Sequence, residues 1–247
     1  MSKPERFVAV ADPHGDMIDE ESKAALFAFI QDFKPTVRVH LGDNWDFRNL
    51  RKGASDDEKA ASLEDDWQMG IDFIREFFDG GKRNHFLRGN HDERLWHFSE
   101  SATGLLRDYA RDGIKRVEST AKRARAAMLP YHVRNGILRI GSLKFLHGYA
   151  HGMNAGQVHA RVYGNCAYGH IHQISSVPIE SSEGPKEARC IGAMCKLDMS
   201  YNSTRTATLR HENGWAYGLL FPDGSYQLFQ TRKLNGKFYA ASETKSY

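Results

Sequence analysis

Polar side chains able to bind a metal ion follow short apolar runs at five places in this 247-residue chain. They occur in "ADPHGD", "LGDNWD", "RGNHDE", "FLHG" and "GHIH", and each segment contains a glycine, which lets the backbone turn sharply. Short apolar runs are typical of buried strands, and α/β sheets place their ligands beyond the carboxyl ends of strands. We therefore expect the five segments to converge at one edge of a sheet.

The donors in these segments are carboxylates, one amide and several imidazoles. They are Asp12, His14, Asp43, Asp46, Asn90, His91, His147, His170 and His172. This mixture suits divalent Mn, Fe, Zn or Ni, and its carboxylates argue against a purely structural zinc site. A carboxylate shared by two ions would hold them a few ångströms apart, which is the arrangement used for displacement at phosphorus.

Each segment taken alone has an ordinary structural interpretation. In "GNHD", Gly89 and Asn90 tolerate a left-handed backbone, and Asp92 can cap the helix that follows. Because five such segments each follow an apolar run, a metal-binding role is favoured over five unrelated turns.

The elements that would position these residues alternate between strands and helices in the first half of the chain. Strands are expected at 7–12, 36–43 and near 86–87, and amphipathic helices at 19–33 and through Phe73 and Phe77. A charged helical region is expected from 103 to 128, with a break near Gly113. The pattern predicts an α/β core with a largely parallel sheet.

The carboxyl half is predicted to be rich in strands. Asn135 and Gly136 are a hairpin signal, 155–164 reads as a short helix, and 166–173 as a strand ending in histidines. Beyond Val177, strand-like segments are separated by the turns "SSEGP", "FPDG" and "LNG". No linker divides the chain, so we expect residues 1–247 to form a single domain with a two-sheet core.

Composition narrows the class of protein. The formal net charge of +3 is too small to indicate a partner, and no apolar run approaches the length of a membrane span. Cys166, Cys190 and Cys195 have no zinc-ribbon spacing and do not pair off, so reduced thiols are expected. The first residues do not have the pattern of a signal peptide. The sequence predicts a soluble cytoplasmic protein with no membrane contact and no obligate protein partner.

The ordered set "DPH", "GDNWD", "GNHD", "HG" and "GHIH" resembles the signature of the calcineurin-like metallophosphoesterases over roughly the first 170 residues. The resemblance implies a four-layer α/β/β/α sandwich of two mixed sheets flanked by helices. The segments "CIGAMCKLDMSY" and "ENGWAYGLLFPDGSYQLFQ" are similar to a subgroup found in bacteriophages and bacteria.

The resemblance also implies roles for individual residues. Two divalent ions, with Mn preferred over Fe, Zn and Ni, would be bound by Asp12, His14 and His172 at the first site and by Asn90, His147 and His170 at the second, with Asp43 bridging. His91 would face the scissile phosphate and protonate or stabilise the leaving oxygen. Asp46 would orient His91 and raise its pKa.

The resemblance implies a phosphoester substrate, and the class we expect is a phosphodiester, which could be DNA or RNA. Protein phosphatases of this family have Arg-Gly after the second motif, where this chain has Phe47 and Arg48. Arg48, Arg51 and Lys52 could contact a substrate phosphate, or could belong to a solvated loop. The alternative is phosphomonoester hydrolysis on a small molecule, nucleotide or phosphoprotein. A catalytically silent binding protein is a more remote alternative, because such members of the superfamily usually lack several ligands and this sequence lacks none.

Two further features keep two interpretations each. His151 in "HGYAHG" could contact substrate or lie on a surface loop. The basic segment 115–125 could follow a nucleic-acid backbone, or be a solvated helix face because acidic residues interleave with it.

Overall fold

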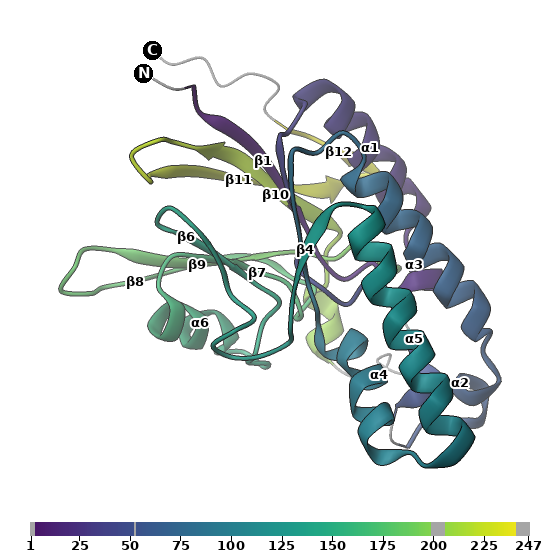
Figure 1. Cartoon of the computed structure of the whole chain (residues 1–247). Coiled ribbons are helices and arrows are strands. Elements are labelled where there is room, and N and C mark those ends of the chain that lie inside the picture. Colours follow the sequence, from purple (N-terminus) through teal and green to yellow (C-terminus); the bar gives the residue numbers. More distant parts are fainter. Residues whose placement is uncertain (1–2, 52, 199–205, 241–247) are drawn as a thin grey trace.

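The computed structural model describes residues 3–51, 53–198 and 206–240 (Figure 1). Lys52, one of the three predicted substrate-binding residues, lies outside the described residues. Within those ranges the larger sheet has seven strands in the order β12(Lys237–Phe238), β11(Tyr226–Leu234), β10(Gly214–Leu220), β1(Glu5–Val10), β2(Val37–His40), β3(Arg83–Leu87) and β4(Ala126–Leu129). Strands β1 to β4 are parallel, and β10 to β12 extend the sheet with antiparallel pairing.

The second sheet is built from the carboxyl half of the chain. Its described strands lie in the order β5(Leu138–Ile140), β6(Leu143–Leu146), β7(Cys166–Tyr168), β9(Lys186–Ile191) and β8(Ile174–Ile179). The three central strands are parallel and the two outer pairs are antiparallel, so both sheets are mixed.

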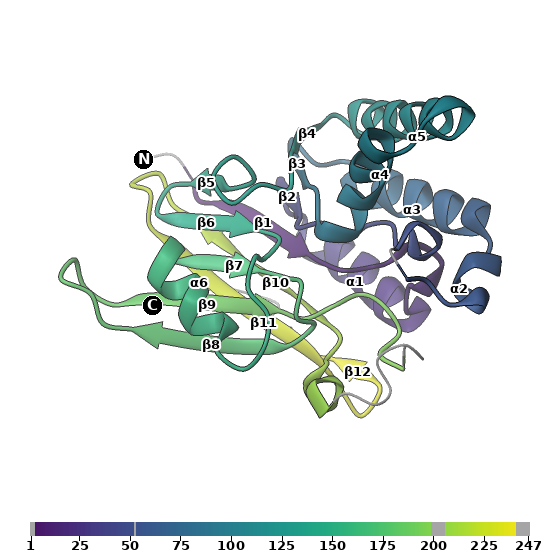
Figure 2. The ribbon, with the colours of Figure 1, turned by 90° about the horizontal axis from the view of Figure 1, so that it is seen from below.

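Helices cover the outer faces of both sheets (Figures 1 and 2). The larger sheet carries most of them, and α6 lies against the second. The α-helices are α1(Glu20–Phe33), α2(Asp56–Ala60), α3(Leu63–Phe78), α4(Asn90–Ser101), α5(Gly104–Arg123) and α6(Ala155–Tyr163), with short 3₁₀ turns at Gly15–Met17, Arg48–Leu50 and Thr206–Arg210.

The alternation along β1 shows why the layers stack in this way. Val8 and Val10 pack against the helices, whereas Phe7 and Ala9 point into the space between the sheets, where Phe7 meets Phe145 edge to face. A separate cluster joins the other face of the second sheet to α6. The predicted four-layer α/β/β/α sandwich is therefore confirmed.

Three local predictions in this frame were wrong. Helix α5 runs unbroken through Gly113, whose missing side chain leaves room for Leu95 and Trp67. The helix ends at Arg123, and the next residues form β4 beside β3, since strand pairing overrides the charged helical pattern. The hairpin turn lies at Gly141 and Ser142, between paired Ile140 and Leu143, and Gly141 adopts a φ of 59°.

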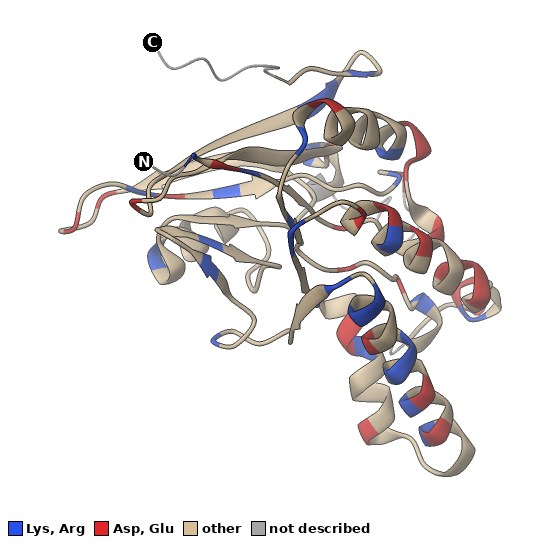
Figure 3. Ribbon diagram, turned by 45° about the horizontal axis from the view of Figure 1, so that its top comes forward, with Lys and Arg blue, Asp and Glu red and all other residues tan. Residues whose placement is uncertain are grey.

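The basic residues of α5 lie among acidic ones (Figure 3). Lys115 pairs with Asp112 at 2.8 Å, and Arg116 pairs with Glu64 of α3 at 3.0 Å. These contacts are those of a solvated helix face. Among the described residues, no helix combines the length and apolar character needed to cross a membrane.

Parallel pairing brings the polar segments to one edge of the sheets. Val10 lies opposite His40, and His40 lies opposite Phe86, so β1, β2 and β3 end side by side. In the second sheet Leu146 lies opposite Tyr168, so the segments after β6 and β7 also leave together.

Candidate dinuclear metal centre

Backbone strain is concentrated in the loops that follow these strands. Five of the seven predicted metal ligands have a positive φ: Asp12 (58°), His14 (53°), Asp43 (50°), His170 (72°) and His172 (52°). Residues with a side chain rarely adopt this left-handed conformation, and such strain persists only where the surroundings hold it in place. It is the kind of local cost that binding and catalytic sites carry.

The loops hold one another through backbone hydrogen bonds. Asp12 N–H donates to Gly42 O at 3.0 Å, and His14 N–H donates to Asp43 O at 3.0 Å. From the second sheet, His170 N–H donates to Asp12 Oδ2 at 2.9 Å. Gly89 allows a close approach between two of the loops, because a Cβ there would collide with Asp43 Oδ1.

One group of donors gathers around Asp43 and His147. His147 Nε2 lies 3.2 Å from Asp43 Oδ2 and 2.9 Å from Asn90 Oδ1. His147 Nδ1 donates to Leu41 O at 2.9 Å, so its Nε2 faces the two oxygens. Burial lowers the pKa of His147, but Asp43 outweighs it and raises that pKa to about 9. His170 also offers a nitrogen within 4.8 Å of the Asp43 and His147 donors. The four groups Asp43, Asn90, His147 and His170 converge on one buried point, where a cation could take the place of the proton on His147 Nε2.

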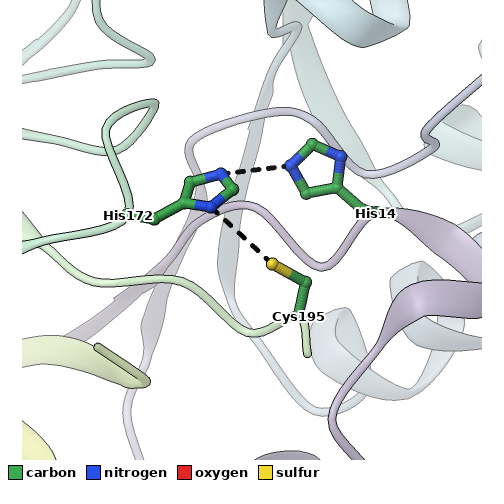
Figure 4. Close-up of side chains that lie close together, drawn as sticks. All are labelled: His14, His172 and Cys195. Atoms are coloured by element: carbon green, nitrogen blue, oxygen red, sulfur yellow. Dashed lines mark hydrogen bonds between the residues drawn. The ribbon is translucent and has the colours of Figure 1, made fainter. Parts of the chain in front are cut away.

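A second group of donors gathers on the other side of Asp43. The Nε2 atoms of His14 and His172 face each other 3.2 Å apart (Figure 4), and His14 Nε2 is 3.9 Å from Asp43 Oδ2. His14 Nδ1 donates to Asp46 Oδ1 at 3.1 Å, which leaves Nε2 as a ligand atom. Burial lowers the pKa of His172 well below its usual range, so its ring is neutral and able to bind a metal.

Asp12 supplies the remaining carboxylate. Its Oδ1 is buried and has no hydrogen-bond partner among the described residues, and burial raises the pKa of Asp12 to about 7. An unpartnered carboxylate oxygen beside facing imidazoles is the environment that a divalent cation would complete. The residues present therefore fit a pair of such ions.

His91 and Asp46 form a hydrogen-bonded pair beside these groups. His91 Nδ1 lies 2.6 Å from Asp46 Oδ1, and His91 N–H donates to Asp43 Oδ1 at 2.7 Å. The net pKa of His91 is lowered, contrary to expectation, because burial outweighs the raising effects of Asp43 and Asp46. Burial raises the pKa of Asp46, but hydrogen bonds from His14 and His91 outweigh it, so the net pKa is well below the usual range. His91 also has a ring nitrogen within 4.8 Å of donor atoms of His14 and Asp43, so by distance alone it could be a metal ligand.

The two described arginines of the predicted substrate-binding set lie close to the centre. Arg48 forms a two-pronged ion pair with Asp16 and reaches Asp46 Oδ2 at 3.4 Å. Arg51 Nε donates to Glu58 Oε1 at 3.0 Å. Both line a cavity of about 500 Å³ that also includes His151 and the predicted ligand His172. Each guanidinium is thus already paired with a carboxylate.

Sequence reasoning missed several residues that shape this centre. Asp66 accepts from Asp46 N–H at 3.0 Å and from Phe47 N–H at 2.7 Å, and nothing in "LEDDW" signals that role. Arg94 contacts His91 and lines the cavity. Its position one helical turn after His91 could have indicated this. Cys195, for which the sequence predicts a reduced thiol, is buried and its Sγ contacts the predicted ligand His172.

Asp92 has the capping role expected of it and a second one. Its Oδ2 accepts from Gly89 N–H at 2.8 Å at the start of α4, and its Oδ1 accepts from Trp45 N–H at 3.1 Å. Asp92 therefore ties the Asp43 loop to the helix that carries Asn90 and His91.

No protein-family model and no curated protein matches the sequence. The chain is similar to several solved structures at low identity. A metallophosphoesterase from Sphaerobacter thermophilus is 13% identical, with 93% of this chain and 88% of that one covered and a TM-score of 0.47. An archaeal phosphodiesterase is also 13% identical, with 91% of this chain and 99% of that one covered and a TM-score of 0.45. A Vps29 single mutant from Entamoeba histolytica is 11% identical, with 95% of this chain and 96% of that one covered and a TM-score of 0.47.

The two mixed sheets and their flanking helices agree with the four-layer sandwich that the resemblance of the sequence motifs to the calcineurin-like metallophosphoesterases implies. Identities and TM-scores this low carry no argument about activity or substrate, which are inferred from the site itself.

Proposed function

We propose that this protein is a phosphoester hydrolase that uses two divalent metal ions and prefers phosphodiesters, with DNA or RNA among its candidate substrates. The observation that carries the proposal is the position of Asp43. Its carboxylate lies between the His14–His172 pair and the His147–Asn90 pair, with the His91–Asp46 pair beside it. A binding protein without catalysis would not need metal-ligand donors held in a strained, buried arrangement, so this observation favours the enzyme.

The donors divide into two ligand sets that share Asp43. Asp12, His14 and His172 would hold one ion, and Asn90, His147 and His170 the other, with Mn first among Mn, Fe, Zn and Ni. When bound, such ions lower the pKa of water and offset negative charge on the phosphoryl oxygens.

The chain's own hydrogen bonds set the orientation of each imidazole. Leu41 O and Asp46 Oδ1 accept from the Nδ1 atoms of His147 and His14, so both Nε2 atoms point inward. Asp46 likewise accepts from His91 Nδ1, which leaves His91 Nε2 on the cavity side. That nitrogen is the atom placed to exchange a proton with a leaving oxygen.

The preference for diesters rests on the loop after Asp46. Phe47, where protein phosphatases carry an arginine, is fully buried and packs edge to face on Trp67. The next residue, Arg48, is held by Asp16. A monoester carries more negative charge than a diester and needs more cationic contacts, so this loop favours the diester.

The test is a substrate panel run with Mn, Ni, Zn and Mg in turn. It compares an aryl phosphodiester, the matching monoester, single-stranded DNA and RNA, with Asp43→Ala as the inactive control. We expect Mn-dependent cleavage of the diester at least as fast as that of the monoester. Monoester cleavage without any diester cleavage would replace the proposal with a phosphomonoesterase. Two bound ions without hydrolysis of any substrate would favour the binding-protein alternative.

A further inference from the structure

Arg94 forms a hydrogen bond with Nε2 of His91, the ring nitrogen that the proposed chemistry requires. It lies three residues after His91 on α4, so the two side chains share one face of the helix. Its Nη1 donates to Asp46 O at 2.8 Å, and its Nη2 lies 3.1 Å from His91 Nε2. The side chain is 18% exposed and lines the cavity.

The contact has only one chemical interpretation. A guanidinium has donors and no acceptor, so His91 Nε2 accepts from Arg94, and the proton of the imidazole is on Nδ1, where it is donated to Asp46. In this arrangement the lone pair of Nε2 is occupied. A leaving oxygen can approach Nε2 only if Arg94 moves to another acceptor, and Nε2 can protonate that oxygen only after it has taken up a proton from water.

The charge of Arg94 is compensated less directly than that of its neighbours. Arg48 and Arg51 each make a short contact with a carboxylate, Asp16 or Glu58. The two hydrogen-bond partners of Arg94 are a carbonyl and an imidazole, and its ion pair with Asp46 Oδ1 is long at 3.8 Å. Asp46 Oδ1 already accepts from two histidines.

We propose that Arg94 is the phosphate-binding arginine of this site and that substrate releases His91 by drawing Arg94 away. A phosphoryl group entering the cavity offers two oxygens to the guanidinium fork, which binds phosphate in a bidentate manner. Arg94 thereby supplies one cationic contact from α4, whereas in the Asp46 loop Phe47 is apolar and Arg48 is held by Asp16. This inference rests on the proposed function.

The test measures binding of inorganic phosphate to Mn-loaded protein by calorimetry, together with metal content, for wild type, Arg94→Gln and Arg94→Lys. Arg107→Gln is the matched control, because Arg107 lies on α5 and its Nε donates to the backbone oxygen of Ala102. We expect Arg94→Gln to retain two ions and to weaken phosphate binding by about tenfold or more. Arg94→Lys keeps the charge without the fork and should be intermediate. Diester KM should rise in the same order.

A purely structural role for Arg94 gives a different result. It would lower the melting temperature and leave phosphate affinity within twofold of wild type, which would overturn the inference. If Arg94→Gln loses its metal ions, the phosphate affinity of Arg94→Lys becomes the test. An affinity equal to that of wild type in Arg94→Lys would also overturn the inference. Wild-type protein that binds two ions but neither binds phosphate nor hydrolyses any ester would refute the proposed function itself, and the role of Arg94 with it.

Discussion

Cys195 Sγ lies 3.9 Å from Nδ1 of His172, and His172 Nε2 faces His14 (Figure 4). If Nε2 binds a metal ion, the proton of the neutral ring must sit on Nδ1, where the sulfur is the acceptor in contact with it. Metal-bound histidines usually donate this proton to a carbonyl or a carboxylate. A thiol sulfur is a weaker acceptor. Cys195 therefore links the hydrophobic core to the first ligand set.

Replacing Cys195 by alanine should weaken metal binding at that set by about tenfold, since loss of such a partner costs about 10–100-fold in affinity. Competition titration with a metal chelator measures the effect without reference to activity. Cys190→Ala is the control, because Cys190 is equally buried but its Sγ contacts Gly169 O instead of a predicted ligand. Equal affinities in the two variants would show that the sulfur does not support His172.

Asp43 and Asn90 should differ in the number of ions they control. Asp43→Ala removes the carboxylate that the two donor groups share, so we expect loss of both ions. Asn90→Ala removes an oxygen near His147 only, so the second ion should weaken while the first stays. Elemental analysis after gel filtration gives the stoichiometry. Loss of both ions from Asn90→Ala, or of one from Asp43→Ala, would contradict this division.

His91→Asn distinguishes a catalytic residue from a ligand. The proposed role predicts two retained ions and a rate on the aryl diester lowered by about 10²–10⁴-fold, the range for losing a general acid. The aryl monoester should be affected less, because its leaving group needs less protonation. His91 also lies near the donors of His14 and Asp43, so a variant that loses an ion would reassign it as a ligand.

His40 should make the fold sensitive to acid. The ring is buried among Phe73, Phe77 and Phe86, and burial lowers the pKa of His40 from 6.5 to about 3. Between these values the unfolded chain binds a proton that the folded chain does not. The stabilisation is thus complete above about pH 6.5 and is lost as pH falls toward 3, at about 1.4 kcal/mol per pH unit at most.

His40→Phe should flatten this slope in urea unfolding measured from pH 7 to pH 4 with chelator present. His97→Gln, at an exposed histidine of α4, is the control and should leave the slope as in wild type. An unchanged slope in His40→Phe would mean that the ring is protonated in the folded protein.

Local patterns along the chain were enough to predict the order of the elements in the first half and the residues at the ends of strands. Apolar runs such as "FVAVAD" and "TVRVHLGD" bury both faces of β1 and β2, so they read as strands without tertiary information. The start of α1 was predicted to within one residue, and Asp19 caps the helix by accepting from Ser22 N–H, a contact between near neighbours. The weak points were at 124–142, where pairing with β3 and the Gly141–Ser142 turn overrode local propensity.

The sequence by itself determined which donors this protein has and which strand ends carry them, because a ligand's chemistry is a property of residue type and strand ends follow from local pattern. Only the tertiary structure decided which neutral or charged groups each donor meets. Arg94 contacting His91, Asp66 holding Asp46 and Cys195 contacting His172 each join separate segments or depend on a side-chain conformation. Likewise the net fall in the pKa of His91 comes from burial, which the packing of both sheets and α4 creates and no single motif encodes.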